Sequence, residues 1–350
     1  MDSITQAVLG AGIQASLLGR QQGRRALIYG AVLGTLPDLD VLASYPDPVS
    51  TMTFHRGYSH SIFVLTALAL LLAWLIRRRW PDAPYSGWRL ALTLTLVLVT
   101  HPILDSFTSY GTQLFWPMMR TPESWSSIFI IDPIYTIPLI AAVLWGAASG
   151  YAGNALRFQW WMLGLSTAYL VGTLGLKHVA ETRVLATLRQ DGVQVAGVFS
   201  SPMPLNALLW RVVVKTESGG YVEAVTSVFD RKPPEYMRQN LRLDLVAPLR
   251  EDALHDRLTW FTDDWLRYDA IGRSLVVTDL RMGMPGYYTF RFVMAERNTQ
   301  GVFMPITPKR WPSDRGSGEQ LRAILKRIFV QTPPLPLNEW AKRNTAPVAQ

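Results

Sequence analysis

Three short polar segments, each at the end of an apolar run, carry histidines and aspartates that could bind a metal ion. Pro37-Asp38-Leu39-Asp40 follows the apolar run 26–36, and His55-Arg56-Gly57-Tyr58-Ser59-His60 precedes the run 61–76. His101-Pro102-Ile103-Leu104-Asp105 closes the run 90–100. Zinc, manganese and iron prefer imidazole and carboxylate ligands. The pattern therefore predicts a site for one or two divalent ions, zinc being the first choice, with six ligands: Asp38, Asp40, His55, His60, His101 and Asp105.

The spacing within these segments allows their side chains to converge. His101 and Asp105 are four residues apart, so on a helix they share one face. Pro102 disfavours a helical conformation at His101, which predicts a break in the helix there. His55 and His60 are five residues apart, and the glycine between them would let the loop fold both toward one point.

Each segment taken alone also has an ordinary explanation. The histidines could be interfacial or loop residues, and the aspartates could cap turns or helices. What favours a metal site is the coincidence of all three at one end of the apolar segments. Other catalytic patterns are absent: the sequence has no His-Glu-x-x-His, no Gly-x-Ser-x-Gly and no Walker loop. Ser59 could act as a nucleophile with a neighbouring histidine as base, but nothing supplies an oxyanion hole.

The composition indicates a membrane-associated first half and a more polar second half. Apolar residues make up 49% of the 350 residues and charged residues 17%, below the roughly 25% of soluble domains. Residues 1–176 hold 10 Lys+Arg and 8 Asp+Glu, and residues 177–350 hold 24 and 18. The net charge of +8 thus divides into +2 and +6 with no basic block, which argues against nucleic-acid binding. The absence of cysteine excludes disulfides, thiolate metal sites and a cysteine nucleophile.

About six membrane helices are predicted in residues 1–176. The segments are Ile4–Leu18, Ala26–Leu36, Ser61–Ile76, Trp88–Thr100, Pro133–Ala148 and Phe158–Leu176. The N-terminus lacks the basic region of a secretory signal, so the first segment is expected to be retained. Gly30 and Gly34 have the spacing of a close helix-packing pair. The second segment is short, because eleven helical residues rise only about 16 Å against a hydrocarbon core of about 30 Å.

The arginine distribution predicts the orientation. With the N-terminus outside, the inner loops carry eight arginines and the short outer loops carry two, Arg56 and Arg120, as the positive-inside rule requires. The eight are Arg20, Arg24, Arg25, Arg77, Arg78, Arg79, Arg89 and Arg157. All three polar segments, together with Asp132, then emerge on the outer face. The C-terminal half lies on the same side.

Residues 177–332 are expected to form a soluble α+β domain. A hairpin is predicted from Leu208–Thr216 and Tyr221–Phe229, and two further strands from Ser274–Leu280 and Tyr287–Met294. Residues 178–189 could extend the sixth helix, and amphipathic helices are predicted at Asp256–Tyr268 and Gly318–Phe329. The proline-rich tail, residues 333–350, is expected to be extended or disordered.

Several motifs resemble a family of bacterial inner-membrane metal-dependent hydrolases, described as LexA-binding and inner-membrane-associated. The likeness rests on the three polar segments and on five further stretches: Met1-Asp2-Ser3-Ile4-Thr5-Gln6, Gly111-Thr112-Gln113-Leu114-Phe115-Trp116-Pro117, Asp132-Pro133-Ile134-Tyr135-Thr136, Leu208-Leu209-Trp210-Arg211 and Asp279-Leu280-Arg281-Met282-Gly283. It covers most of the chain. The resemblance implies a helical membrane protein that binds metal through the Asp/His segments and hydrolyses a substrate. Some members have histidine where Gln6 stands here, and LexA binding would need a cytoplasmic surface.

Together these observations predict a multi-pass inner-membrane enzyme with its metal site and C-terminal domain on the outer, periplasmic side. Bound metal would make hydroxide available to attack an ester or phosphoester. Asp132 is the candidate catalytic base. The expected partners are membrane lipid and, because the site lies at the membrane rim, an amphiphilic, lipid-like substrate; the sequence does not identify a protein partner. The alternative is a non-catalytic metal-binding scaffold or a transporter; transport is disfavoured because no other helix interior carries a carboxylate.

Overall fold

A computed structural model describes residues 1–151, 153–313 and 316–345. The chain forms two compact units. The first comprises Met1–Ala43 and His55–Thr173, and the second comprises Ser44–Phe54 and Leu174–Gln350. The short segment Ser44–Phe54, with helix α3 at Pro48–Phe54, therefore belongs with the C-terminal half although it lies in the N-terminal half of the sequence.

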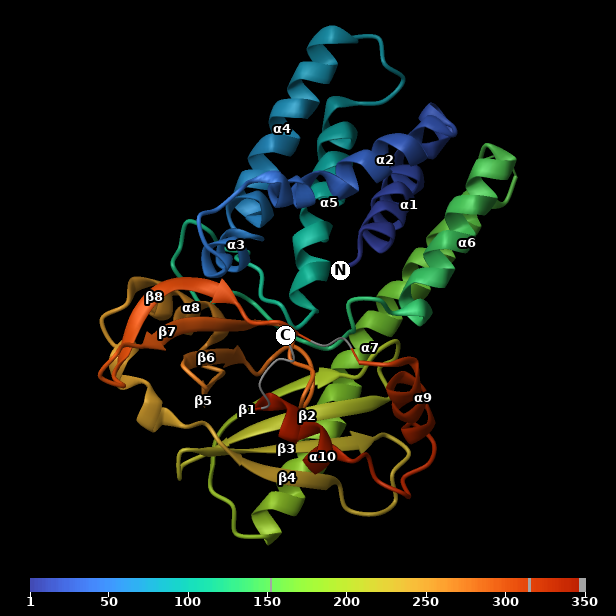
Figure 1. The fold of residues 1–350 in the computed structure, drawn as a ribbon. Helices are drawn as coiled ribbons and strands as arrows, with labels where there is room; N and C mark the ends of the chain where they lie inside the picture. Colours follow the sequence, from blue (N-terminus) through green and yellow to red (C-terminus); the bar gives the residue numbers. More distant parts are fainter. Residues whose placement is uncertain (152, 314–315, 346–350) are drawn as a thin grey trace. The chain divides into compact units, whose positions relative to one another are not determined.

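The first unit is helical, and each predicted helix is present (Figure 1). The helices are α1 (Ser3–Gln22), α2 (Arg25–Thr35), α4 (Ile62–Arg79), α5 (Gly87–Ser106), α6 (Pro133–Ser149) and the part of α7 (Ala155–Gln190) up to Thr173; from Leu174, α7 belongs to the second unit. Two short 3₁₀ helices are η1 (Leu36–Leu42) and η2 (Tyr58–His60). Polar caps begin several of them: the side chains of Asp2, Ser61 and Asp132 accept hydrogen bonds from the first backbone N–H groups of α1, α4 and α6. Helix α7 continues without interruption through residues 178–189, as predicted.

Helices α1 and α2 pack with their backbones in contact. A Cβ atom built on Gly10 would overlap the carbonyl oxygen of Gly30, and one built on Gly34 would lie 2.7 Å from that of Gln6. Only glycine permits so close an approach. This confirms the predicted close-packing role of Gly30 and Gly34, and it fixes the position of η1, which follows α2 directly.

Only part of the helical unit meets the criteria for a membrane span. Among the described residues, α5 alone is long and apolar enough; a second span exists if Pro48–His60 and Ile62–Arg79 cross as one broken helix. This corrects the expected six crossings. Helix α2, with 11 residues, is too short for about 30 Å of hydrocarbon, and α6, with 17, is at the lower limit of a spanning helix. Helix α1 buries polar side chains such as Gln6 and Gln14.

Helix α5 is continuous through Pro102, so the predicted break there is wrong. The proline lies near the C-terminal end of the helix, so the loss of one backbone hydrogen bond affects only its last turns. Continuity keeps His101 and Asp105 on one face.

The second unit contains two four-stranded antiparallel sheets with strand orders β1-β2-β3-β4 and β5-β6-β7-β8. The strands are β1 (Val195–Pro202), β2 (Leu209–Thr216), β3 (Gly220–Ser227), β4 (Glu235–Asn240), β5 (Leu266–Ile271), β6 (Ser274–Asp279), β7 (Arg291–Arg297) and β8 (Phe303–Arg310). The predicted β2–β3 hairpin is present, and β6 pairs with β7, whose start lies later than predicted. Helix α8 covers Ala253–Thr262, and the prediction that it reaches Tyr268 is wrong, because Asp263 and Asp264 adopt left-handed conformations and the chain then enters β5.

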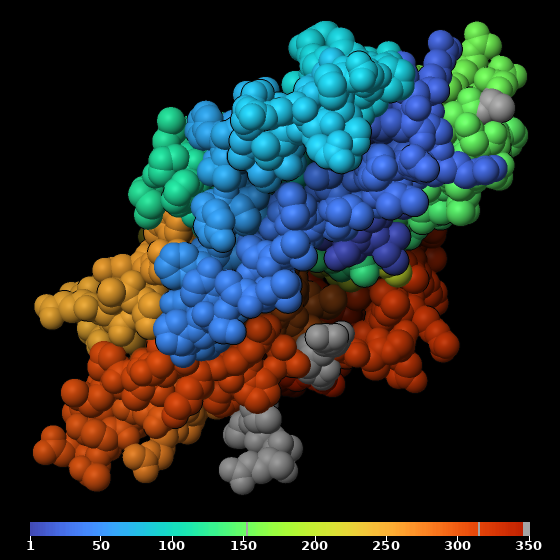
Figure 2. All heavy atoms as spheres, turned by 90° about the horizontal axis from the view of Figure 1, so that it is seen from above, coloured from blue at the N-terminus to red at the C-terminus, as the bar shows by residue number. Residues whose placement is uncertain are grey.

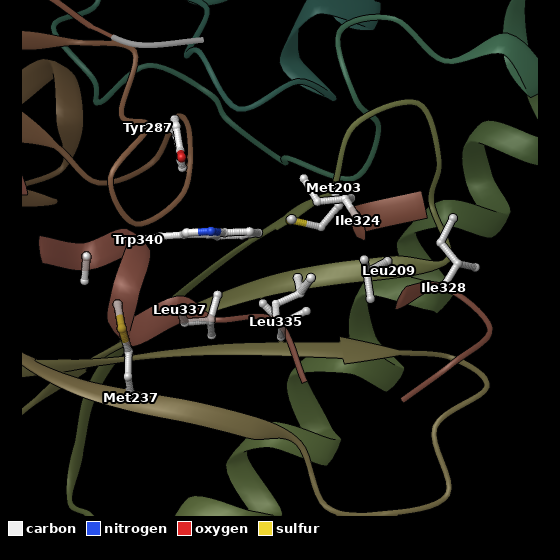
Figure 3. Packing of buried hydrophobic residues seen from close by; sticks show 11 residues of the cluster. Met203, Leu209, Met237, Tyr287, Ile324, Ile328, Leu335, Leu337 and Trp340 are labelled. Atoms are coloured by element: carbon white, nitrogen blue, oxygen red, sulfur yellow. The ribbon is translucent and has the colours of Figure 1, made fainter. Parts of the chain in front are cut away.

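The C-terminal tail takes part in the core of this unit. Leu335, Leu337 and Trp340 are buried against Leu209 and Met237 in one apolar cluster, together with α9 (Gly318–Arg327) (Figure 3). Leu337–Ala341 forms helix α10. The prediction of an extended or disordered tail is therefore wrong for this part, because its apolar side chains have a sheet to cover. Residues 346–350 of that tail lie outside the described residues.

Candidate metal centre

Four of the six predicted ligands meet at one point in the helical unit. They are Asp38 on η1, His60 on η2, and His101 and Asp105 on α5, and their ligand atoms lie within 4.8 Å of one another. We call them the group of four. Nε2 of His60 lies 3.3 Å from Nε2 of His101. Each Nε2 also lies 3.3–3.5 Å from Oδ1 of Asp38 and from Oδ2 of Asp105.

Five of the six distances among these two nitrogens and two oxygens are therefore 3.3–3.5 Å, and all six are within 4.8 Å. Imidazole nitrogens and carboxylate oxygens bind zinc at about 2.0–2.2 Å. The four side chains fit a divalent ion in their chemistry and in their convergence on one point.

The hydrogen bonds of the two imidazoles direct both Nε2 lone pairs at this centre. Nδ1 of His101 is 2.6 Å from the carbonyl oxygen of Gly34, which can only accept, so Nδ1 carries the proton. The hydroxyl of Ser59 donates to Asp40, and its oxygen is 3.0 Å from Nδ1 of His60, which then donates to it. A cation at this centre would offset the charge of the two carboxylates. A divalent metal ion would supply such a charge.

Asp40 and His55 lie beside the group and not within it. Oδ1 of Asp40 accepts from Nδ1 of His55 at 2.8 Å, and Oδ2 accepts from the backbone N–H of Arg56 at 2.9 Å and from Ser59 at 2.8 Å. Oδ2 is also 3.6 Å from Nδ1 of His60. A carboxylate behind a ligating histidine orients the ring and raises its basicity. The geometry therefore gives Asp40 the position of an orienting group, and a direct ligand role for Asp40 and His55 stays a prediction.

Four residues make contacts around Asp105 and His101 that the sequence patterns did not assign, and one of them is Met1, whose N-terminal ammonium group donates to Oδ1 of Asp105. The amide nitrogen of Gln6 donates to Oδ1 of Asp105 at 3.1 Å and to the carbonyl of His101 at 3.2 Å. Nε of Arg56 lies 3.2 Å from Oδ2 of Asp105, and this arginine has a left-handed backbone with φ of 58°. Thr108 accepts a hydrogen bond from the same guanidinium. The sequence did give a reason to expect a role for Gln6 at the site, because some members of the family that the chain resembles have histidine at this position.

The group is closed on most sides. The side chains of His60 and Asp105 are 0% exposed and that of His101 is 1% exposed, whereas that of Asp38 is 20% exposed. Burial alone would raise the pKa of Asp38, but its hydrogen bonds with His101 and His60 hold that pKa well below the usual range. Asp38 is therefore ionised and is the member of the group that water can reach.

Asp132 is not one of the group of four. Its Oδ1 caps α6 by accepting from the backbone N–H groups of Ile134 and Tyr135, and its Oδ2 accepts from the hydroxyl of Tyr169 at 2.8 Å. Burial raises the pKa of Asp132 in spite of these bonds. The contacts explain Asp132 as a helix cap, and its catalytic role stays a prediction.

Fold and site together define a helical unit that gathers two histidines and two aspartates, joined to a two-sheet unit. The sequence profile of the YdjM inner membrane protein family matches residues 1–180. This is more than half of the 350 residues, so the chain belongs to that family, whose name supports an inner-membrane location.

Two curated relatives share parts of the chain. "Uncharacterized protein YfhP" of Bacillus subtilis (strain 168) is 25% identical over 230 residues, 63% of this chain and 67% of the relative. "Inner membrane protein YbcI" of Escherichia coli (strain K12) is 35% identical over 114 residues, 32% of this chain and 64% of the relative. No solved structure matches the chain significantly.

Proposed function

We propose that this protein is an inner-membrane metal-dependent hydrolase that binds one divalent ion, with zinc as the first choice, in the group of four. The convergence of the ligand atoms of Asp38, His60, His101 and Asp105 to within 4.8 Å of one another carries the proposal. The substrate class is an ester or phosphoester, lipid-like because the protein belongs to an inner-membrane family. A two-ion site that adds Asp40 and His55 is the less favoured arrangement, since those two side chains bond to each other.

The residues of the chain would have distinct roles in hydrolysis. A bound ion would lower the pKa of a water molecule toward neutrality. His60, His101 and Asp105 are buried and held by second contacts, so they would fix the ion. Asp38 is partly exposed, so it is the ligand that water or substrate would replace or approach. Asp132 remains the proposed base, helped by a pKa that burial raises.

A non-catalytic metal scaffold is the second candidate, and one observation favours it. The group of four offers four protein ligand atoms, the number that closes a structural zinc site, whereas catalytic sites keep one position for water. The absence of thiolates favours the enzyme, because structural zinc sites typically include cysteine. The exposed edge at Asp38 favours it as well.

Hydrolysis can be tested on the full chain in detergent, loaded with zinc or manganese. Phospholipids and chromogenic phosphate and carboxylate esters serve as substrates, with chelated protein as the blank. If the protein is an enzyme, chelation should abolish turnover, and His101→Ala should reduce it at least about 100-fold. Asp132→Asn should reduce turnover without lowering the metal content. Cobalt substitution should show a five-coordinate spectrum with water bound. A tetrahedral cobalt spectrum together with no turnover on any substrate would contradict the hydrolase proposal and favour the non-catalytic metal scaffold.

We also propose the outer, periplasmic side for the N-terminus, the group of four and the C-terminal unit, and a multi-pass arrangement of the helices. The support is the bias of arginines toward the opposite loops, among them Arg77, Arg78 and Arg79 at the end of α4. His101 and Asp105 lie at the other end of α5, the helix most suited to crossing the membrane.

A further inference from the structure

A large cavity lies in the helical unit, separate from the group of four. It has a volume of about 1080 Å³ and is lined by α1, α2, the end of α4, the α4–α5 turn and the start of α5. None of its lining residues belongs to the group of four. Leu94 on its wall precedes His101 by seven residues on α5, about 10 Å along the helix axis. Figure 2 shows the cyan turn between α4 and α5 beside the blue α1–α2 region.

The wall that α2 contributes is apolar and open. Ile28 and Val32, one turn apart, are 62% and 61% exposed, and both line the cavity. Leu33 and Leu94 continue the apolar surface inward. An exposed apolar hollow of this size, in a protein of an inner-membrane family, is suited to hydrocarbon chains.

The rim of the cavity carries positive charge and tryptophan. Arg79 lines it, and its guanidinium lies over the ring of Trp80 at 5.2 Å. Arg78, the preceding residue, lies over Trp74 at 5.5 Å. Asp82 is the acidic residue of the lining. Tryptophan and arginine gather at the membrane interface, and basic pockets between membrane helices bind anionic lipid headgroups.

The cavity also contains a buried polar group with no partner. Gln14 is 1% exposed, its amide nitrogen donates to Gln22 at 2.9 Å, and its Oε1 has no hydrogen-bond partner among the residues that the structure describes. Both glutamines line the cavity. A buried unpaired acceptor is costly, so a ligand that brings a hydroxyl group to this wall would be favoured.

We infer that this cavity binds one phospholipid with an anionic, hydroxyl-bearing headgroup, of the phosphatidylglycerol class. Its acyl chains lie along Ile28 and Val32, and its phosphate pairs with Arg79. Because the group of four is elsewhere, this lipid is held and not cleaved, and the inference goes beyond the proposed hydrolysis.

Native mass spectrometry of the full chain in detergent tests this inference directly. Phosphatidylglycerol and phosphatidylcholine with identical acyl chains are added separately. The wild type should retain one phosphatidylglycerol, with about tenfold weaker retention of phosphatidylcholine, because only the former carries net negative charge and hydroxyl groups. Equal retention of the two lipids would overturn the inference.

Charge variants at exposed positions give the matched comparison. Arg79→Gln should weaken phosphatidylglycerol binding about tenfold, and Asp82→Asn should strengthen it. Arg120→Gln should change nothing, although Arg120 also lies over an aromatic ring, Phe115, at 5.2 Å. Identical binding by Arg79→Gln and Arg120→Gln would refute the headgroup contact.

Filling the cavity tests the acyl chains. Val32→Trp should abolish retention of both lipids, and because Val32 is exposed, the thermal unfolding midpoint should stay unchanged. If Val32→Trp binds as the wild type does, the chains are not in this cavity. If that variant fails to fold, the two charge variants decide.

Discussion

Asp40 is the residue that links the first polar segment to the second. It accepts from His55, Arg56 and Ser59, and through Ser59 it sets which nitrogen of His60 faces the group of four. Hydrogen bonds from His55 hold its pKa below the usual value against the effect of burial, which alone would raise it. Asp40 therefore stays a carboxylate at neutral pH and can orient a ligand without being one.

We predict that Asp40→Asn weakens metal affinity about 10- to 100-fold, the usual cost of losing an orienting contact, whereas His101→Ala removes binding. Competition with a chromogenic chelator measures both. Asp82→Asn changes an exposed carboxylate in the α4–α5 turn, and His178→Ala changes a histidine outside the group of four. Neither change should alter the metal affinity. An Asp40→Asn affinity equal to that of the wild type would exclude the orienting role.

At the scale of elements, the contact between α1 and α2 supports the site. A Cβ atom on Gly30 would overlap the carbonyl oxygen of Gly10 and lie 2.6 Å from Cβ of Gln14. Helix α2 also supplies the Gly34 carbonyl that holds His101, and η1 with Asp38 follows it. Moving α2 outward would therefore move Asp38 and the Gly34 carbonyl away from the other three residues of the group of four.

Gly30→Ala should destabilise the protein by about 1–3 kcal/mol through overpacking, and it should lower metal retention. Gly172→Ala on α7 is the matched control, since a Cβ there meets nothing within 4 Å. That change should be neutral or stabilising by about 0.5–1 kcal/mol, because alanine favours a helix. Thermal unfolding of the two variants side by side gives the comparison, and equal midpoints would contradict the close packing.

The two sheets of the second unit are linked by buried charge. Glu223 on β3 accepts from Nε of Arg211 on β2 and from the hydroxyl of Tyr288 at 2.8 Å, and Arg211 also donates to the carbonyl of Leu280. Glu223 is 0% exposed and Arg211 is 1% exposed. Because Leu280 and Tyr288 lie next to strands of the second sheet, the Arg211–Glu223 pair connects the two sheets by hydrogen bonds.

Glu223→Ala should cost about 3–5 kcal/mol, because it leaves the Arg211 guanidinium buried without a counter-charge. The comparison is Glu296→Ala, which removes the exposed pair with Lys309 at 3.2 Å and should cost about 0–1 kcal/mol. Both changes in the free energy of unfolding can be measured by denaturant titration of the full chain. Similar losses of unfolding free energy for Glu223→Ala and Glu296→Ala would show that the buried pair does not stabilise the contact between the sheets.

For the whole molecule, the arginine distribution makes a prediction about orientation. Arg77, Arg78 and Arg79 end α4 on the side opposite to His101 and Asp105 along α5. A reporter active only in the cytoplasm, fused after Gln350, should stay silent, and a periplasmic reporter there should be active. A strong cytoplasmic signal would reverse the proposed orientation and place the group of four on the inner side.

Sequence reasoning located the helices and the ligand-bearing segments because apolar runs and scarce histidines are local features. It could not separate Asp40 and His55 from the group of four, because the bonds of Asp40 to Ser59 and Arg56 join residues far apart in sequence. It expected a break at Pro102, since a local preference does not show that the helix is nearly at its end. The burial of Trp340 was missed for the same reason: the surface it covers comes from distant strands.

The measurement that tests the central claim most directly is metal content with ligand spectroscopy on the purified chain. We predict one divalent ion per chain, with two histidine nitrogens and two carboxylate oxygens at about 2.0–2.1 Å by X-ray absorption. Alanine at His60, His101 or Asp105 should each remove the ion, and alanine at His178 should not. A chain that binds no ion after loading, or one whose ion survives His101→Ala, would contradict the account.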